Sequence, residues 1–268
     1  MSDSFPEELR GLTMVITGAG RGIGKELARS AALVGVRVAL LEIDQASLDQ
    51  SVSEIKALGG DVAGYCVDLG IEDDVIATLA RVEKDFGHVD CLVNNAMVHE
   101  TEDLLSTTLE NWNHSLRITL TASFLCIRAL LPGMIARRAG NIINIGSVNA
   151  KVMLGSDSYS IAKAGMHALT RTVAVRYGSE GIRCNTVVPG TIATSAWQER
   201  VDKNPQVFDN LKPWYPLGRI GKPRDIVEAV LFLASSRSEW MSGSELVVDG
   251  GLLAAPAPMF RIIEGPQQ

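Results

Sequence analysis

The sequence predicts an α/β protein, with one domain built on a doubly wound parallel sheet that helices cover on both faces. Short runs rich in Val, Ile and Leu alternate with longer stretches of helical periodicity along the chain. The runs are apolar on both faces, which is typical of buried parallel strands joined by right-handed helical crossovers. A length of 268 residues suits one large domain, and no internal repeat or linker interrupts its middle.

Seven strands and five principal helices follow from these patterns. The strands are expected at residues 14–17, 36–42, 61–68, 91–94, 141–147, 183–188 and 245–249. The helices are expected at residues 22–33, 71–86, 112–138, 158–177 and 223–234.

Composition and charge exclude several classes of protein. A net charge of −6 and a pI near 5.3 argue against a nucleic-acid partner, because binding to phosphates requires a basic surface. No uncharged apolar run reaches 18 residues, so we expect no membrane span. The first residues lack the basic and apolar regions of a signal peptide, which predicts a cytoplasmic protein.

The cysteines and histidines show no metal-binding or disulfide pattern. Four cysteines are widely separated, with no C-x-x-C pair: Cys66, Cys91, Cys126 and Cys184. In a reducing compartment such residues are expected to be small buried apolar side chains. The four histidines show no H-x-x-x-H spacing, so no metal site is predicted.

A glycine-rich turn follows the first strand and opens the first helix. Its sequence is Thr17-Gly18-Ala19-Gly20-Arg21-Gly22-Ile23-Gly24. Glycines let the backbone approach a pyrophosphate closely, and a helix N-terminus offers free N–H groups and a favourable dipole. A tight βα turn without a ligand is the alternative, but the position after the first strand favours a dinucleotide site.

A carboxylate ends the second strand. Glu42 lies 24 residues beyond Gly18, close to the position where a carboxylate accepts hydrogen bonds from the adenosine ribose. A 2′-phosphate would place like charges together, so Glu42 favours NAD over NADP. Arg21 in the glycine turn acts in the opposite direction, as a cation for a 2′-phosphate. The alternative for Glu42 is a solvated residue at a strand end.

Three residues form a candidate catalytic group. Tyr159 and Lys163 are four apart on a predicted helix and therefore share one face. They follow Ser147, which ends a strand at the edge of the sheet where ligands of open α/β sheets bind. An ammonium near the phenol is expected to lower the pKa of Tyr159, and the serine hydroxyl can hydrogen-bond a substrate oxygen.

Taken together, these motifs make the chain resemble the compact, single-domain branch of the short-chain dehydrogenase/reductase family over residues 12–252. Beyond the glycine turn, Ser147, Tyr159 and Lys163, the resemblance rests on Asp68, Asn94-Asn95-Ala96, Pro189-Gly190 with Thr194, and Asp249-Gly250-Gly251. The family's fold is Rossmann-like, with seven parallel strands in the order 3-2-1-4-5-6-7. Several motifs in the family's order make an accidental similarity improbable.

The resemblance implies a set of cofactor contacts. Asp68 and Leu69 would flank the adenine, Asn95 and Ala96 would line the adenosine ribose, and Ile192 and Thr194 would hold the nicotinamide. The full set comprises Gly18, Arg21, Gly22, Ile23, Gly24, Glu42, Asp68, Leu69, Asn95, Ala96, Tyr159, Lys163, Pro189, Gly190, Ile192 and Thr194.

The sequence departs from the family pattern at two positions. Met97 stands where the family usually has the glycine of Asn-Asn-Ala-Gly, so the pocket is expected to be narrower there. Thr119 stands where the family commonly has an asparagine that supports a helix kink and a proton relay through the lysine. A threonine hydroxyl can support such a kink by bonding to a carbonyl one turn earlier.

Residues 191–223 are expected to cover the substrate. This stretch follows the sixth strand and carries several aromatic residues and prolines, and loops of this length are usually functional. Packing of the rings against the domain alone is the alternative. The substrate-contacting residues are expected to be Met97, Ser147, Val148, Asn149, Leu154, Trp197 and Trp214. They suggest a bulky, mostly hydrophobic substrate.

The predicted function is NAD-dependent interconversion of a secondary alcohol and a ketone, with Tyr159 as acid/base. An NADP-dependent ketone reductase, a low-turnover NAD(P)-binding sensor or scaffold, and an epimerase or dehydratase remain alternatives. A homotetramer is expected, partly because the family resemblance implies one and partly because helices 112–138 and 158–177 carry surplus apolar residues, among them Leu125, Ile127, Leu130 and Val173. The apolar tail, residues 252–268, is expected to pack on a neighbouring subunit.

Overall fold

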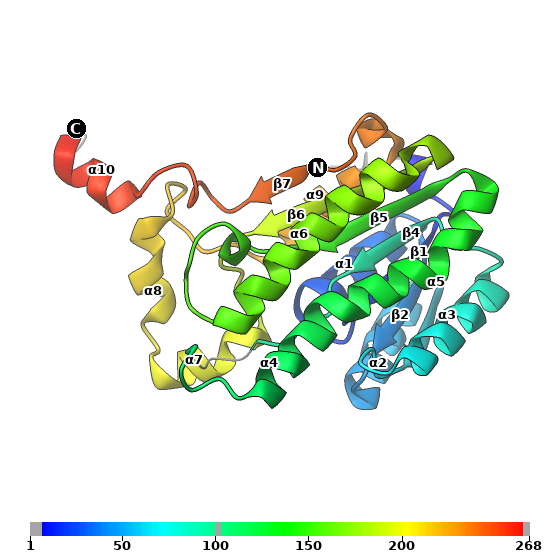
Figure 1. Ribbon diagram of the computed structural model, residues 1–268, viewed down its shortest axis with the longest axis horizontal. Coiled ribbons are helices and arrows are strands. Elements are labelled where there is room, and N and C mark those ends of the chain that lie inside the picture. The colour runs from blue at the N-terminus through cyan, green and yellow to red at the C-terminus, as the bar shows by residue number, and fades with distance from the viewer. Residues whose placement is uncertain (1–6, 100–102, 265–268) are drawn as a thin grey trace.

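A seven-stranded parallel sheet forms the middle layer of the protein, with helices on both faces (Figure 1). The computed structural model describes residues 7–99 and 103–264. The strands are β1 (Thr13–Thr17), β2 (Arg37–Glu42), β3 (Val62–Cys66), β4 (Cys91–Asn94), β5 (Gly140–Ile145), β6 (Ile182–Pro189) and β7 (Glu245–Val248). Their order in the sheet is β3-β2-β1-β4-β5-β6-β7, which confirms the predicted topology.

The strand order reverses between β1 and β4. β1 pairs with β2 on one side, with Ile16 opposite Leu40, and with β4 on the other, with Ile16 opposite Val93. The connections that follow β1 and β4 run toward opposite edges of the sheet, so a crevice opens between them at the carboxyl ends of the strands. The fold therefore places a binding site at the end of β1, where the glycine-rich turn begins.

Two groups of helices cover the sheet, and each buries its apolar side against one face. One face packs against α1 (Gly22–Leu33), α2 (Gln45–Ala57) and α9 (Pro223–Ala234). The other packs against α3 (Glu72–Phe86), α5 (Ala122–Arg137) and α6 (Asp157–Tyr177). α2 was not among the five principal helices expected, because its buried face consists only of Leu48, Ser51 and Ile55.

The helix expected at residues 112–138 has three parts. It starts as α4 (Leu109–Leu116), where the Thr108 side chain accepts a hydrogen bond from the backbone N–H of Asn111. It passes through a π-helical turn, Arg117–Thr121, and continues as α5. The whole stretch Leu109–Arg137 is long and apolar enough to cross a membrane. Half of its most apolar 18-residue window is buried inside this fold.

The apolar residues named as surplus for assembly belong to the core of the subunit itself. The side chains of Leu125, Ile127, Leu130 and Val173 are all buried against the sheet. The expectation that they face a neighbouring subunit was therefore wrong. These residues belong to the apolar cluster that α3, α5 and α6 form with the sheet, so this face of the sheet uses them itself.

All four cysteines are free thiols, and three are buried as expected. Burial raises the pKa of Cys91, Cys126 and Cys184 to about 12, so their thiols are poor nucleophiles. Cys66 is exposed instead of buried, because it ends the edge strand β3. Among residues 7–99 and 103–264, no three His, Cys, Asp or Glu side chains are arranged to hold a metal ion.

Residues 191–223 form short helices beside the carboxyl ends of the strands. They include α7 (Gln198–Lys203) and α8 (Val207–Leu211), which lie in yellow at one end of the molecule in Figure 1. Beyond β7 the chain leads to α10 (Ala257–Glu264), which projects from the body of the protein. The last four residues of the predicted tail, 265–268, lie outside the described residues.

Candidate active site

A cavity of about 900 Å³ lies at the carboxyl ends of the strands. Residues far apart in the sequence form its walls, from the glycine-rich turn after β1 to the loop after β7. The predicted cofactor residues on its wall are Gly18, Arg21, Gly22, Ile23, Glu42, Asp68, Leu69, Asn95, Ala96, Tyr159, Lys163, Pro189, Gly190, Ile192 and Thr194. The predicted substrate residues on its wall are Met97, Ser147, Val148, Asn149, Leu154, Trp197 and Trp214.

The glycine-rich turn needs its glycines for two physical reasons. Gly18 and Gly22 have φ values of +63° and +58°, a region that side chains disfavour. Gly24 is not on the cavity wall. A Cβ there would lie 2.3 Å from the carbonyl oxygen of Gly18, so Gly24 lets α1 pack directly under the turn. The turn presents bare backbone and the start of a helix to the cavity.

Thr17 joins this turn to the loop after β4. Its Oγ1 accepts hydrogen bonds from the backbone N–H groups of Asn95 at 2.9 Å and Ala96 at 3.0 Å. The amide nitrogen of Asn95 donates back to the carbonyls of Thr17 and Gly18. Sequence reasoning used Thr17 only as the first residue of the glycine-rich motif. Its role in holding the loop after β4 against the glycine-rich turn is seen only in the folded structure.

Glu42 is held rigidly at the end of β2. It is 6% exposed, and its carboxylate accepts hydrogen bonds from the backbone N–H groups of Gly20 at 2.9 Å, Ile43 at 2.9 Å and Asp44 at 3.2 Å. Arg21, the competing cation, is exposed at the rim. A dinucleotide fits this half of the cavity, because bare glycine backbone and a fixed carboxylate lie side by side.

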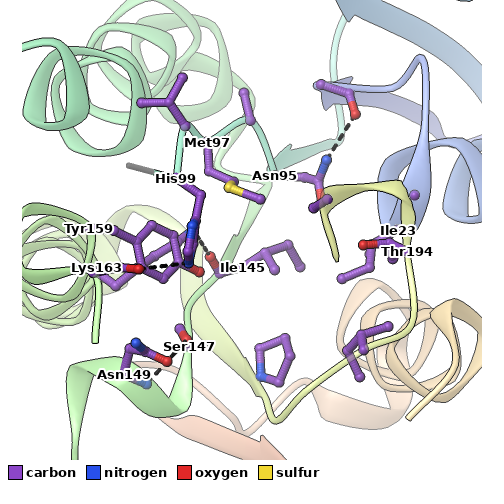
Figure 2. A pocket seen from close by; sticks show the side chains of 18 of the residues that line it. Ile23, Asn95, Met97, His99, Ile145, Ser147, Asn149, Tyr159, Lys163 and Thr194 are labelled. Atoms are coloured by element: carbon purple, nitrogen blue, oxygen red, sulfur yellow. Dashed lines mark hydrogen bonds between the residues drawn. The ribbon is translucent and has the colours of Figure 1, made fainter. Parts of the chain in front are cut away.

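Ser147, Tyr159 and Lys163 meet at the other half of the cavity (Figure 2). Ser147 lies two residues beyond the end of β5, while Tyr159 and Lys163 share one face of α6. The Lys163 side chain is 1% exposed, and its Nζ donates a 2.5 Å hydrogen bond to the carbonyl of Ile145. This Nζ lies 5.6 Å from the centre of the Tyr159 ring.

The expected lowering of the Tyr159 pKa by Lys163 is not what the structure shows. Burial raises the pKa of Tyr159, and a hydrogen bond with Ser147 opposes this only partly. Burial also lowers the pKa of Lys163 to about 7. Desolvation therefore dominates both groups, because α6 and β5 enclose them.

The buried lysine predicts a specific pH dependence of stability. With its pKa lowered from 10.5 to about 7, the unfolded chain binds more protons in this window, so the free energy of unfolding should rise with pH from 7 to 10.5. Lys163→Met should lack this gain. Denaturant titrations of both proteins at several pH values give the difference in the free energy of unfolding, parent minus variant. This difference should be constant below pH 7 and should increase above it. A difference independent of pH would contradict this prediction.

Thr119 and Met97 are the two positions where the sequence differs from the family pattern. Thr119 lies in the π-helical turn and is fully buried. Its Oγ1 contacts the backbone of Val98, accepting from the N–H at 3.4 Å and lying 3.5 Å from the carbonyl, so it does not bond one turn back in its own helix. Met97 is 37% exposed and points into the cavity between Asn95 and His99 in Figure 2.

The amide of Asn149, proposed as a polar substrate contact, is engaged within the protein. Its Nδ2 donates to the carbonyl of Gly155 at 3.0 Å, and its Oδ1 lies 3.3 Å from the Ser147 hydroxyl. Asn149 therefore orients Ser147 and the loop before α6. Trp197, also on the cavity wall, packs its ring against Phe208 at 5.6 Å between centroids.

Among the wall residues that sequence reasoning did not assign to the site, His99 and Arg200 lie beside the Tyr159 ring or its neighbour. The His99 ring lies 5.0 Å from the Tyr159 ring between centroids, as Figure 2 shows. The guanidinium of Arg200 lies 3.2 Å from Nδ1 of His99. The two residues are 101 positions apart, so no local sequence signal could have paired them.

The fold and this cavity define a class of protein: a doubly wound α/β protein with a cavity at the switch point of its sheet, the place where such folds bind their ligands. A family model described as enoyl-(acyl carrier protein) reductase matches residues 18–253. An uncharacterized oxidoreductase of Schizosaccharomyces pombe is 41% identical over 92% of each chain. The 2-(S)-hydroxypropyl-CoM dehydrogenase 3 of Xanthobacter autotrophicus is 33% identical over 92% of this chain and 98% of its own.

A crystal structure of an oxidoreductase of the short-chain dehydrogenase/reductase family from Burkholderia thailandensis is similar throughout. It has a TM-score of 0.88 and 41% identity, and the match covers 96% of this chain and 98% of that one. The present chain belongs to the short-chain dehydrogenase/reductase family. Members of this family use the nicotinamide cofactors NAD or NADP.

Proposed function

We propose that the protein interconverts a secondary alcohol and a ketone, with NAD as cofactor and a bulky, mostly hydrophobic substrate. The observation that carries the proposal is one continuous cavity. A glycine turn and a fixed carboxylate line one half, and Ser147, Tyr159 and Lys163 line the other. A bound nicotinamide would accept or supply the hydride of the reaction.

Each catalytic side chain has a task in this proposal. Tyr159 takes the proton of the substrate hydroxyl during oxidation and returns it during reduction. Ser147 donates a hydrogen bond to the reacting oxygen and orients it. Lys163 is held by the Ile145 carbonyl near the Tyr159 ring and supports the phenolate and the cofactor ribose.

The direct test is a panel of cyclic, aromatic and aliphatic secondary alcohols with NAD, followed as cofactor reduction by absorbance. Saturable turnover with at least one bulky alcohol is the expected result. Tight cofactor binding without turnover of any alcohol would support the sensor alternative instead.

The assembly proposed is a homotetramer with two kinds of two-fold interface. Its support comes from exposed apolar side chains rather than from the buried residues first expected. Phe124, Ile161 and Val175 on α5 and α6 are 43%, 46% and 85% exposed. In α10, Met259, Phe260, Ile262 and Ile263 are 50–82% exposed.

Light scattering at micromolar concentration should therefore return about four times the 28.8 kDa of one chain. Val175→Lys should weaken the assembly, because it places a charge where apolar area would be buried. Ser179→Lys, at an exposed polar position just beyond the end of α6, is the matched control. A monomer of the parent protein would contradict the proposal.

The proposal also includes a cytoplasmic location for the protein. The four free thiols are consistent with the reducing conditions of that compartment.

A further inference from the structure

One cationic side chain faces the substrate half of the cavity with no acidic partner that explains it. Arg200 lies on α7, is partly buried and lines the cavity wall. Within the described part of the chain, no carboxylate lies within 4 Å of its guanidinium. The neighbouring Glu199 is engaged elsewhere, because it pairs with Lys203 at 2.6 Å.

Neutral aromatic groups hold this guanidinium in place. Its Nη2 lies 3.2 Å from Nδ1 and 3.4 Å from Nε2 of His99, and its central carbon lies 5.1 Å from the Trp197 ring centre. Burial and the charge of Arg200 lower the pKa of His99 to about 4, so the imidazole is neutral at physiological pH. A neutral ring can accept a hydrogen bond and orient the arginine without neutralising it.

The Arg200 guanidinium also lies close to Tyr159, the proposed acid/base. The His99 ring that receives Arg200 packs against the Tyr159 ring, and its Nε2 lies 3.0 Å from the Ser156 hydroxyl. One imidazole therefore separates the guanidinium from the proposed acid/base. A guanidinium has five N–H donors in a planar fork, and His99 occupies only part of this capacity.

The surrounding wall strengthens binding of an anion. Leu154, Trp197 and Trp214 line the same half of the cavity and present largely apolar surface. A charge-assisted hydrogen bond gains strength where such groups exclude water.

We propose that Arg200, positioned by His99 and Trp197, binds a carboxylate on the substrate, so that the preferred substrates are hydroxy acids and the corresponding keto acids. This inference rests on the proposed alcohol–ketone chemistry and narrows its substrate class. The hydroxyl carbon then lies at Tyr159, the carboxylate lies at Arg200, and the hydrophobic chain fills the space beside the tryptophans.

Matched acid and ester substrates test the proposal. The probes are 2-, 3- and 4-hydroxyhexanoate and the methyl ester of each, assayed with NAD. The parent should prefer the acid over its ester for at least one position of the hydroxyl. In Arg200→Gln, the acid-to-ester ratio of kcat/KM should fall about 30- to 1,000-fold, as expected when one partner of a desolvated charge pair is removed.

Two further variants make the result specific. Lys203→Gln removes the same charge from the same helix, on a side chain that is 73% exposed and paired with Glu199, so the ratio should stay at the parental value. His99→Phe keeps a ring beside Tyr159 but removes the acceptor for Arg200, so the ratio should fall to an intermediate value. A parent that does not prefer any acid, or an Arg200→Gln ratio equal to that of the parent, overturns the proposal.

A binding measurement separates this inference from the proposed chemistry. Hexanoate, which carries no hydroxyl group, is titrated calorimetrically into the parent, Arg200→Gln and Lys203→Gln in the presence of NADH. Weakening in Arg200→Gln alone supports the anion site even if the parent oxidises no alcohol, an outcome that would overturn only the proposed function. Where no alcohol is oxidised, equal or absent hexanoate binding in all three proteins overturns the inference.

Discussion

Replacing Tyr159 by phenylalanine is expected to lower kcat by about 10²- to 10⁴-fold, the usual contribution of a general acid or base. The substitution removes one hydroxyl and leaves the ring. Tyr159 is 9% exposed and packs against His99, so the phenylalanine ring should occupy the same place. The dissociation constant for the cofactor should change by only a few-fold.

A second buried tyrosine supplies the matched control. Tyr65 in β3 is 3% exposed and donates a 2.8 Å hydrogen bond to Asp85, outside the cavity wall. Tyr65→Phe removes the same atom and should lower stability by about 1 kcal/mol without changing kcat. Activity of Tyr159→Phe within a few-fold of the parent would remove Tyr159 from the proposed mechanism.

The cofactor preference is the second large effect expected. The parent should use NAD with a kcat/KM about ten- to a thousandfold above that for NADP, because like charges at Glu42 and a 2′-phosphate repel by on the order of 1–4 kcal/mol. Three backbone N–H groups hold the carboxylate of Glu42, so it cannot turn away from a phosphate without losing these bonds. The exposed Arg21 at the rim offers a single opposing charge.

Glu42→Ala should therefore move the NAD-to-NADP ratio toward NADP by a large part of that factor. The control is Asp49→Asn, which removes one negative charge from the exposed side of α2, where Asp49 accepts a hydrogen bond from Gln45. Its ratio should equal that of the parent. Equal or better use of NADP by the parent, or an unchanged ratio in Glu42→Ala, would show that Glu42 does not select the cofactor.

Most of the fold followed from local sequence patterns. Strands buried on both faces, such as β1 with five buried residues, appear as continuous apolar runs. α2 lacked that signal, because only one residue per turn is buried on its inner side. The π-helical turn at Arg117–Thr121 had no signal of its own in the sequence, and the contact of its Thr119 with the backbone of Val98 joins segments 21 residues apart.

The sequence by itself determined the fold class, the strand order through its family motifs, and most of the predicted residues that line the cavity. Short spacings were sufficient for this, because the glycine turn, Glu42 and the Tyr159–Lys163 pair each lie on or next to one element. The tertiary structure alone decided what surrounds these groups. It placed Arg200 against His99, engaged Asn149 with Ser147, and buried Tyr159 so that its pKa rises. Desolvation and contacts between distant segments depend on how complete elements pack, which no local pattern records.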